Sequence, residues 1–123
     1  MLHKILFTAA VLLAIGGGVA GAATTLTTPP LPGGVDYQCD VLNVGKRPIE
    51  FDINIFSATG GNIVHRSCMG VQPGKVCGIA PNSQDAPSSS YCVVTLVKGS
   101  KRSIRASLTA KVGGAIAASA AAQ

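Results

Sequence analysis

Apolar and polar residues alternate strictly along residues 49–57 of this chain. The apolar set and the polar set are Ile49, Phe51, Ile53 and Ile55 against Glu50, Asp52 and Asn54. A period of two puts the sets on opposite faces of a β-strand, so a half-buried antiparallel strand is expected here. The other strands are expected to cover its apolar face.

Five further segments have a strand pattern, and turn-forming residues separate them. Residues 91–97 are apolar on both alternating sets, which is typical of a central strand. Pro73 and Gly74 occupy the central positions of a type II turn. Gly45 permits a positive φ in an earlier turn, and Gly60 and Gly61 mark a hairpin connection. The five expected strands are 37–43, 62–68, 75–80, 91–97 and 102–110.

Six or seven short strands at intervals of about ten residues predict an all-β fold, a small antiparallel β-sandwich. The expected division of the chain is a signal peptide at 1–22, a leader at 23–34, a β-sandwich domain at 35–110 and a flexible tail at 111–123. The leader is rich in Thr, Pro and Gly, and its three prolines do not fit a sheet interior. The tail is rich in Gly and Ala and too short for a stable isolated helix.

The N-terminus has the three parts of a secretory signal. Lys4 is followed by an apolar run at 5–15, and Ala20-Gly21-Ala22 fits the small-residue cleavage rule. An uncleaved membrane anchor is the alternative, since residues 5–23 are long enough to span a bilayer. Three consecutive glycines at 16–18 favour the signal peptide. The mature protein is therefore expected to be secreted, periplasmic or extracellular, with no membrane span.

Four cysteines in a small secreted chain predict two disulfides. Three pairings are possible, and Cys68–Cys77 with Cys39–Cys92 is the favoured one. The first pair flanks the Pro73–Gly74 turn, and the second joins the first strand to the central strand. Aromatics are scarce, with three Phe, two Tyr and no Trp, so the core depends more heavily on such cross-links.

A zinc site made by the same cysteines is the alternative to disulfides. Structural zinc sites present cysteines two to four residues apart, whereas 28, 8 and 14 residues separate these four. No metal and no cofactor is therefore expected.

Several turn motifs resemble those of bacterial immunoglobulin-like modules. They are Val41-Leu-Asn-Val-Gly45, Gly60-Gly61 and Val71-Gln-Pro-Gly74, with the alternating strand between the first two. The chain also resembles small secreted bacterial domains of unassigned function that carry cysteines on such strands. The resemblance covers residues 37–79 and implies an extracytoplasmic, immunoglobulin-like β-sandwich. It transfers no catalytic residue, and the cysteine pattern and missing Trp depart from antibody domains.

No catalytic set is apparent in the expected mature chain. His65 is its single histidine, and no serine lies in a G-x-S-x-G elbow. His65 is expected to face solvent in mid-strand. Glu50 and Asp52 share a strand face, where pairing with basic residues of a neighbouring strand is expected and calcium is the alternative. The protein is therefore not expected to be an enzyme.

The net charge is +5, and removing Lys4 leaves +4. The densest basic cluster is Lys98, Lys101, Arg102 and Arg105, and Lys46 with Arg47 form a second basic turn. An anionic cell-surface glycan or envelope component is the candidate partner. Solubility and protection of sheet edges are the alternative roles of these charges. Nucleic acid is not expected, because few aromatics are available for base stacking.

These observations favour a secreted, non-enzymatic envelope or extracellular module with a binding, adhesion or structural role. One alternative is a subunit that assembles by edge-strand pairing, with itself or with a protein partner, through residues 24–34 or the tail. The other alternative is a small protease inhibitor that presents the loop at 81–90.

Overall fold

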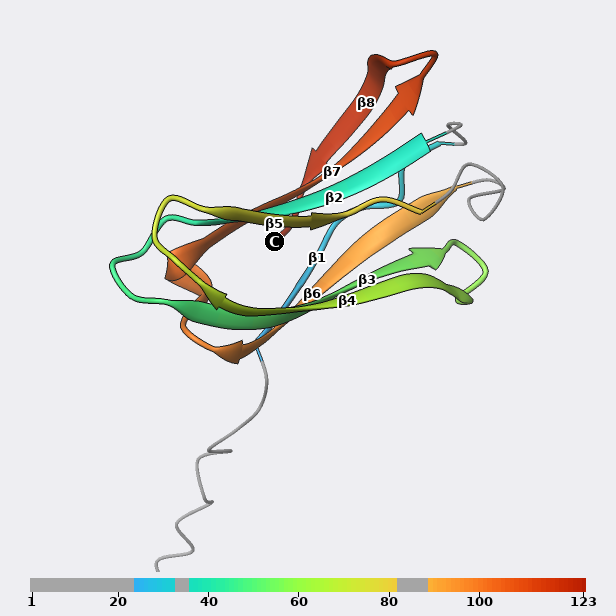
Figure 1. Cartoon of the computed structure of the whole chain (residues 1–123). Helices are drawn as coiled ribbons and strands as arrows, with labels where there is room; N and C mark the ends of the chain where they lie inside the picture. The colour runs from blue at the N-terminus through green and yellow to red at the C-terminus, as the bar shows by residue number, and fades with distance from the viewer. Residues whose placement is uncertain (1–23, 33–35, 82–88) are drawn as a thin grey trace, which may run out of the picture.

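A computed structural model describes residues 24–32, 36–81 and 89–123, and the predicted signal peptide lies outside these ranges. In the described part, eight strands form two antiparallel sheets that face each other (Figure 1). The first sheet has the order β1 (Thr25–Thr27), β6 (Ser90–Lys98), β3 (Ile49–Ser57), β4 (Asn62–Val71). The second has the order β5 (Val76–Ile79), β2 (Asp36–Asn43), β7 (Ile104–Val112), β8 (Ala115–Ala121).

The alternating segment at 49–57 forms β3, as predicted. The side chains of its four apolar residues are buried, and the intervening polar ones are half-buried on the outer face. Strands β2, β6 and β7 alternate in the same way, so the core lies between the two sheets. The prediction of a small antiparallel β-sandwich is confirmed.

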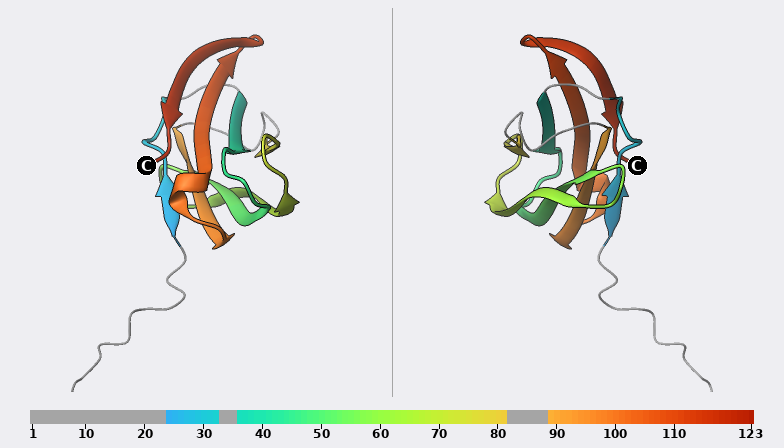
Figure 2. Two further views of the ribbon diagram at one scale, coloured as in Figure 1. Left: turned by 90° about the vertical axis from the view of Figure 1, so that its left-hand side faces the viewer. Right: turned by 90° about the vertical axis from the view of Figure 1, so that its right-hand side faces the viewer.

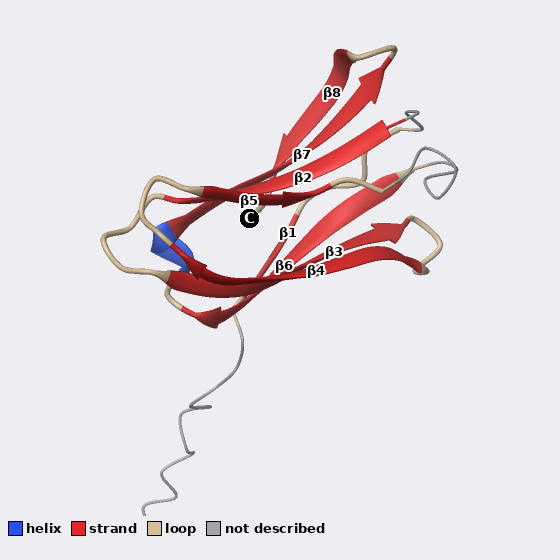
Figure 3. Cartoon of the chain, viewed as in Figure 1, coloured by secondary structure: helices blue, strands red, loops and turns tan. Residues whose placement is uncertain are grey.

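The remaining strand predictions hold with shifted ends. Lys75 N–H donates to the Gln72 carbonyl at 3.0 Å, which closes the predicted Pro–Gly turn between β4 and β5. The expected strand at 102–110 begins later, because Lys101–Ser103 forms a single-turn 3-10 helix, η1, before β7 (Figure 3).

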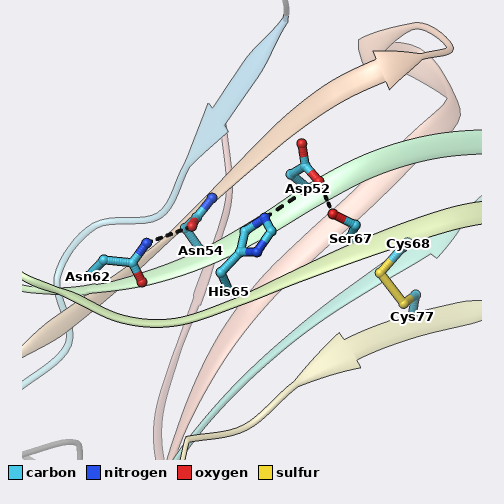
Figure 4. Close-up of polar contacts among 7 residues, drawn as sticks. All are labelled: Asp52, Asn54, Asn62, His65, Ser67, Cys68 and Cys77. Carbon is cyan, nitrogen blue, oxygen red and sulfur yellow. Dashed lines mark hydrogen bonds and ion pairs between the residues drawn. A yellow bond between two sulfur atoms is a disulfide. The ribbon is translucent and has the colours of Figure 1, made fainter.

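Both predicted disulfides are present. Cys39 of β2 bonds to Cys92 of β6, so this disulfide crosses the core between an inner strand of each sheet. Cys68 of β4 bonds to Cys77 of β5, and this disulfide joins one edge strand of each sheet (Figure 4). Arg66 reinforces the same side, since its Nη1 donates to the Gly78 carbonyl at 2.7 Å.

The interpretation of residues 23–34 as a leader outside the fold is wrong for the described part, 24–32. Thr25–Thr27 pairs with β6 as an edge strand, and Leu26 is buried in the core. The buried Thr28 hydroxyl accepts the Cys92 N–H at 2.9 Å, and the Tyr37 hydroxyl donates to the Pro32 carbonyl at 2.9 Å. The prolines follow the paired strand Thr25–Thr27, and Leu31, which lies between two of them, forms an isolated antiparallel bridge with Ser90.

The interpretation of residues 111–123 as a flexible tail is also wrong. Gly113 and Gly114 have φ values of 58° and 82°, the left-handed geometry of a two-residue type I′ turn. The turn returns the chain along β7, and residues 115–121 form β8 (Figure 2). Ala118, Ala120 and Ala122 pack against the core. The domain therefore extends beyond the predicted boundaries of 35 and 110.

The C-terminal residue closes the side of the sandwich opposite the Cys68–Cys77 disulfide. Gln123 N–H donates to the Thr27 carbonyl at 3.2 Å, and Thr27 N–H donates to the Gln123 carbonyl at 3.0 Å. Ala122 N–H donates to the Ala106 carbonyl at 2.9 Å. The last two residues therefore connect β7 of one sheet to β1 of the other.

The two disulfides are expected to contribute unequally to stability. The sequence separations of the bonded cysteines are 53 for Cys39–Cys92 and 9 for Cys68–Cys77. In the chain-entropy treatment these separations correspond to stabilisation of the folded state by about 4 and about 2.7 kcal/mol. Cys39→Ala with Cys92→Ala is therefore expected to remove most of a net stability of about 5 kcal/mol. Cys68→Ala with Cys77→Ala should leave a folded protein with a lower melting temperature. Denaturant unfolding of both double variants measures the difference, and an equal or reversed order would contradict this account.

Candidate functional site

Three chain connections meet at one end of the sandwich, on the left in Figure 1. They join β2 to β3, β4 to β5 and β6 to β7. Val44 N–H donates to the Ser103 carbonyl at 2.8 Å, so the first connection contacts the third. Asn43 N–H donates to the Lys75 carbonyl at 3.0 Å, so the end of β2 contacts the second.

Most basic side chains of the described chain are gathered on these connections. Of the ten lysines and arginines, Lys4 lies outside the described residues and Arg66 and Lys111 lie elsewhere on the sandwich. The other seven lie in or beside the three connections, and all are exposed. We call this set the basic end: Lys46, Arg47, Lys75, Lys98, Lys101, Arg102 and Arg105.

A groove of about 580 Å³ lies between the first and third connections. We call it the basic groove. Its charged lining is Lys46 and Arg47 from one connection and Lys98 from the other. Ser100 and Ser103 also line it, and their hydroxyl oxygens are 3.1 Å apart in a hydrogen bond. Cationic and hydroxyl donors therefore share one concave surface.

A second depression, of about 620 Å³, lies on the other side of the β6–β7 connection. Lys101 and Arg105 line it together with the carboxylate of Asp40. The rest of its lining is mainly apolar and includes Leu42 and Val76. The predicted cluster of Lys98, Lys101, Arg102 and Arg105 is thus one region of surface, but Lys98 lines the basic groove, Lys101 and Arg105 line the second depression, and Arg102 lines neither.

Asn43 holds the basic end in shape from inside. Its side chain is fully buried. Its Nδ2 donates to the carbonyls of Arg47 and Val71, each at 2.8 Å, and its Oδ1 accepts the Gly45 N–H at 2.9 Å. One amide thus satisfies three backbone groups, which fixes the turn that carries Lys46 and Arg47 and ties it to the end of β4.

Gly45 serves this turn without the positive φ that glycine permits. A Cβ at this position would lie 3.0 Å from both Cβ and Oγ of Ser103. Glycine is favoured here because the first and third connections approach each other closely, which is the same approach that forms the basic groove.

Part of the basic end was predicted from the sequence, namely the cluster at 98–105 and the turn at 46–47. Their meeting in one groove, and the contributions of Lys75 and Asn43, were not predicted. The Asn-x-Gly pattern at 43–45 is a local turn signal that includes Asn43, whereas Lys75 carries no signal beyond its place in a turn.

Polar side chains on the outer face of β3 and β4 form the second candidate cluster (Figure 4). The Ser67 hydroxyl donates to Asp52 Oδ1 at 2.6 Å, and His65 Nε2 lies 3.6 Å from the same oxygen. Asn62 Nδ2 donates to Asn54 Oδ1 at 2.8 Å. His65 is exposed in mid-strand, as predicted.

The order of these groups does not suit a Ser–His–Asp relay. In such a relay the imidazole lies between the hydroxyl and the carboxylate and takes the hydroxyl proton. Here Asp52 lies between Ser67 and His65, so the hydroxyl donates to a carboxylate instead. The contacts are cross-strand pairs that hold the edge strand β4 to β3.

The structure bears on several other sequence expectations. Glu50 lies opposite Lys98 in the β3–β6 register, the cross-strand placement expected for a carboxylate and a basic residue. Within the described ranges, no group of three or more His, Cys, Asp or Glu side chains is arranged to hold a metal ion. Among the same residues, no helix is long and apolar enough to cross a bilayer. The loop at 81–90 that was proposed for protease inhibition lies largely outside the described residues.

Comparison with known proteins does not assign a family. No protein-family model and no curated protein sequence matches the chain. One solved structure that aligns is titled "Structure of infectious bursal disease virus Gt strain", with 11% identity and a TM-score of 0.33. The alignment covers 83% of this chain and 25% of that one. So low a TM-score supports no argument about function, and the immunoglobulin-like resemblance stays a prediction.

Replacing Asn43 is expected to be costly for its size. Asn43→Ala leaves two carbonyls and one N–H without their partner, which should lower the free energy of unfolding by about 2–3 kcal/mol. Asn54→Ala is the matched control, because it removes a half-buried amide that accepts one side-chain hydrogen bond, and should cost no more than about 1 kcal/mol. Urea unfolding of both variants tests this. Equal losses would show that Asn43 does not organise the basic end.

Proposed function

We propose that this protein is a secreted, non-enzymatic β-sandwich module that binds anionic polysaccharide of the cell envelope through its basic end. The observation that carries the proposal is the gathering of seven exposed basic residues on three connections. The connections β3–β4 and β7–β8, and those joining β1 to β2 and β5 to β6, contain no lysine or arginine. A one-sided distribution of this kind produces a directed positive potential, which steers and holds polyanions.

Secretion fits the cross-links that the fold needs. Disulfides persist in oxidising compartments and are rare in the cytosol, and both disulfides here join the two sheets. The predicted signal peptide supports the same compartment. An envelope glycan is a polyanion that such a protein meets after export.

A glycan fits this end better than a bilayer does. Membrane-surface proteins combine basic residues with an apolar face that enters the lipid. Val44, Val76 and Val97 are large apolar side chains exposed at or beside the basic end, and they come from one connection and from strands of both sheets. Three positions on separate elements are a weaker lipid-binding surface than one continuous apolar face.

Binding is expected to be strong at low salt and to disappear at high salt. The Debye length falls from about 30 Å at about 0.01 M to about 3 Å at about 1 M salt. Replacing Lys98, Lys101, Arg102 and Arg105 by Gln should weaken low-salt binding by at least about tenfold. The measurement is co-sedimentation of the exported, oxidised protein with carboxylated, sulfated and uncharged forms of one polysaccharide.

Single variants provide a charge-matched control for this experiment. Lys101→Gln and Lys111→Gln each remove one positive charge. Lys101 lies at the basic end, whereas Lys111 lies near the opposite end of β7. Only the first should weaken binding measurably. Equal effects, or binding to the uncharged polysaccharide, would contradict the proposal. Preferential binding to anionic vesicles would show that the ligand of the basic end is a lipid and not a glycan.

Self-assembly is a second candidate function, favoured by the open edge of β8. This strand has seven residues and no charged side chain, and β7 is its only strand partner among the described elements. The other edges are better protected: β1 and β5 have three and four residues, and Arg66 extends from β4 to β5. Long uncharged edges are the ones that recruit another strand.

The peptide groups available for such pairing can be identified. Ala122 N–H is directed toward Ala106 of β7. Hydrogen-bonding direction alternates along an antiparallel strand, so the peptide groups of Ser119 and Ala121 point to the open side. A second copy could add its own β8 there in antiparallel orientation, which would place the two basic ends at opposite ends of a dimer.

A lysine on this edge is expected to prevent association. Ser119→Lys should leave a monomer, because a charge on an edge strand opposes pairing with an identical edge. Thr109→Lys places the same charge opposite Ser119 on β7, away from the free edge, and should leave association intact. Sedimentation equilibrium over a concentration series measures both variants. A wild-type protein that stays monomeric at the highest soluble concentration would rule out this second function.

A further inference from the structure

We propose that the basic groove is a discrete binding site for one tetrahedral oxyanion group, a phosphate or a sulfate ester. The inference rests on the proposed function and adds the chemical group that the basic end selects. Binding of one anion in this concave site is distinct from the general attraction that the seven charges of the basic end exert on any polyanion. The lining residues that carry it are Lys46, Arg47, Lys98, Ser100 and Ser103.

The donors of the groove come from two connections that the fold holds at a fixed separation. The Val44 to Ser103 hydrogen bond of 2.8 Å joins the connections beside the groove. Asn43 fixes the carbonyl of Arg47 from the interior. Ile49, which also lines the groove, has only 2% of its surface exposed and belongs to the core. The base of the groove is therefore built on packed structure.

The donor set fits a tetrahedral oxyanion better than a carboxylate. Two ammonium groups and one guanidinium offer more donors than the two oxygens of a single carboxylate need. A phosphate or sulfate ester presents three oxygens, and charge-assisted bonds from lysine and arginine to such oxygens are the strong ones. Ser100 and Ser103 share one hydrogen bond, which uses one of their two hydroxyl hydrogens. The other hydrogen can be donated to a ligand.

One carboxylate lies beside the basic groove without lining it. Glu50 lies opposite Lys98 in the register of β3 and β6. It reduces the positive potential at Lys98 and selects against weakly charged ligands. Glu50→Gln is therefore expected to tighten anion binding. Asp36→Asn is the matched control, because it changes the net charge equally. Asp36 is the first residue of β2, whereas the last residue of that strand, Asn43, lies at the basic end.

Amide shift titration of the exported, oxidised protein tests the site with inorganic phosphate, sulfate and acetate at constant ionic strength. Phosphate and sulfate should give saturable shifts at residues 45–47 and 98–103, and acetate should bind at least about threefold more weakly. The triple variant with Lys46, Arg47 and Lys98 replaced by Gln should bind phosphate at least about tenfold more weakly. The triple variant at Lys101, Arg102 and Arg105 removes the same charge outside the groove and should lose less than about threefold.

Two further arms distinguish the source of the oxyanion. A sulfated polysaccharide should outcompete its carboxylated form for the groove if the ester is on a glycan. Vesicles of phosphatidylcholine with phosphatidic acid, whose headgroup is a phosphate monoester with three free oxygens, should outcompete both if it is on a lipid headgroup. In either case the groove triple variant should lose the preference while retaining salt-dependent attraction to polyanions.

Three results would contradict the groove site: equal loss of phosphate binding in the two triple variants, wild-type shifts that do not saturate, or shifts that are spread evenly over the basic end. If polysaccharide binding were intact in that case, the proposed function would stand and only the groove site would be rejected. Loss of polysaccharide binding in the wild-type protein, with saturable phosphate shifts, would remove the proposed function and leave the groove as a small-anion site. Tighter binding by Glu50→Gln than by Asp36→Asn would support the groove, and equal effects would count against it.

Discussion

The Cys39–Cys92 disulfide joins an inner strand of one sheet to an inner strand of the other, and the rest of the sandwich depends on that link. The core between the sheets is mainly aliphatic, with Tyr37 and Phe51 as its buried aromatics. Small domains with such cores have little net stability without cross-links. The Cys68–Cys77 disulfide then holds one side, and the backbone pair between Thr27 and Gln123 holds the other. The connections at the ends are therefore not needed to hold the two sheets together, and their exposed side chains can carry charge.

The antiparallel arrangement of the strands explains why the charge gathers at one end. Successive strands run in opposite directions, so every second connection lies at the same end of the sandwich. The basic residues lie in or beside the connections that follow β2, β4 and β6, which are far apart in the sequence. The hydrogen bonds from Asn43 N–H to the Lys75 carbonyl and from Val44 N–H to the Ser103 carbonyl hold these connections together. A surface that attracts anions and a groove that orders a single anion then arise from the same packing of turns.

Local patterns in the sequence were sufficient for the inner strands and for the edge strands β4 and β5, but not for β1 and β8. The alternation in β3 and the Pro73–Gly74 turn each report on residues within one turn or strand, and both predictions were confirmed. The edge strands β1 and β8 were missed, because Thr25–Thr27 is too short for a periodic signal and alanine has little hydrophobic contrast. Gly113–Gly114 was the overlooked signal, since two glycines between β-compatible segments indicate a hairpin. At the basic end, the clusters at 46–47 and 98–105 were each recognised in the sequence, but it was not recognised that they lie side by side in the fold.

The sequence by itself determined that the protein is an all-β sandwich with two disulfides, because strand periodicity, turn chemistry and cysteine spacing are properties of neighbouring residues. It also determined the number and sign of the charges. Only the tertiary structure decided that Lys46 and Lys98 line one groove, that the buried Asn43 supports it, and that the first and last described segments belong to the sheets. Those features depend on which strands pair and which connections share an end. Long-range pairing is set by the packing of the whole core, so no local pattern encodes it.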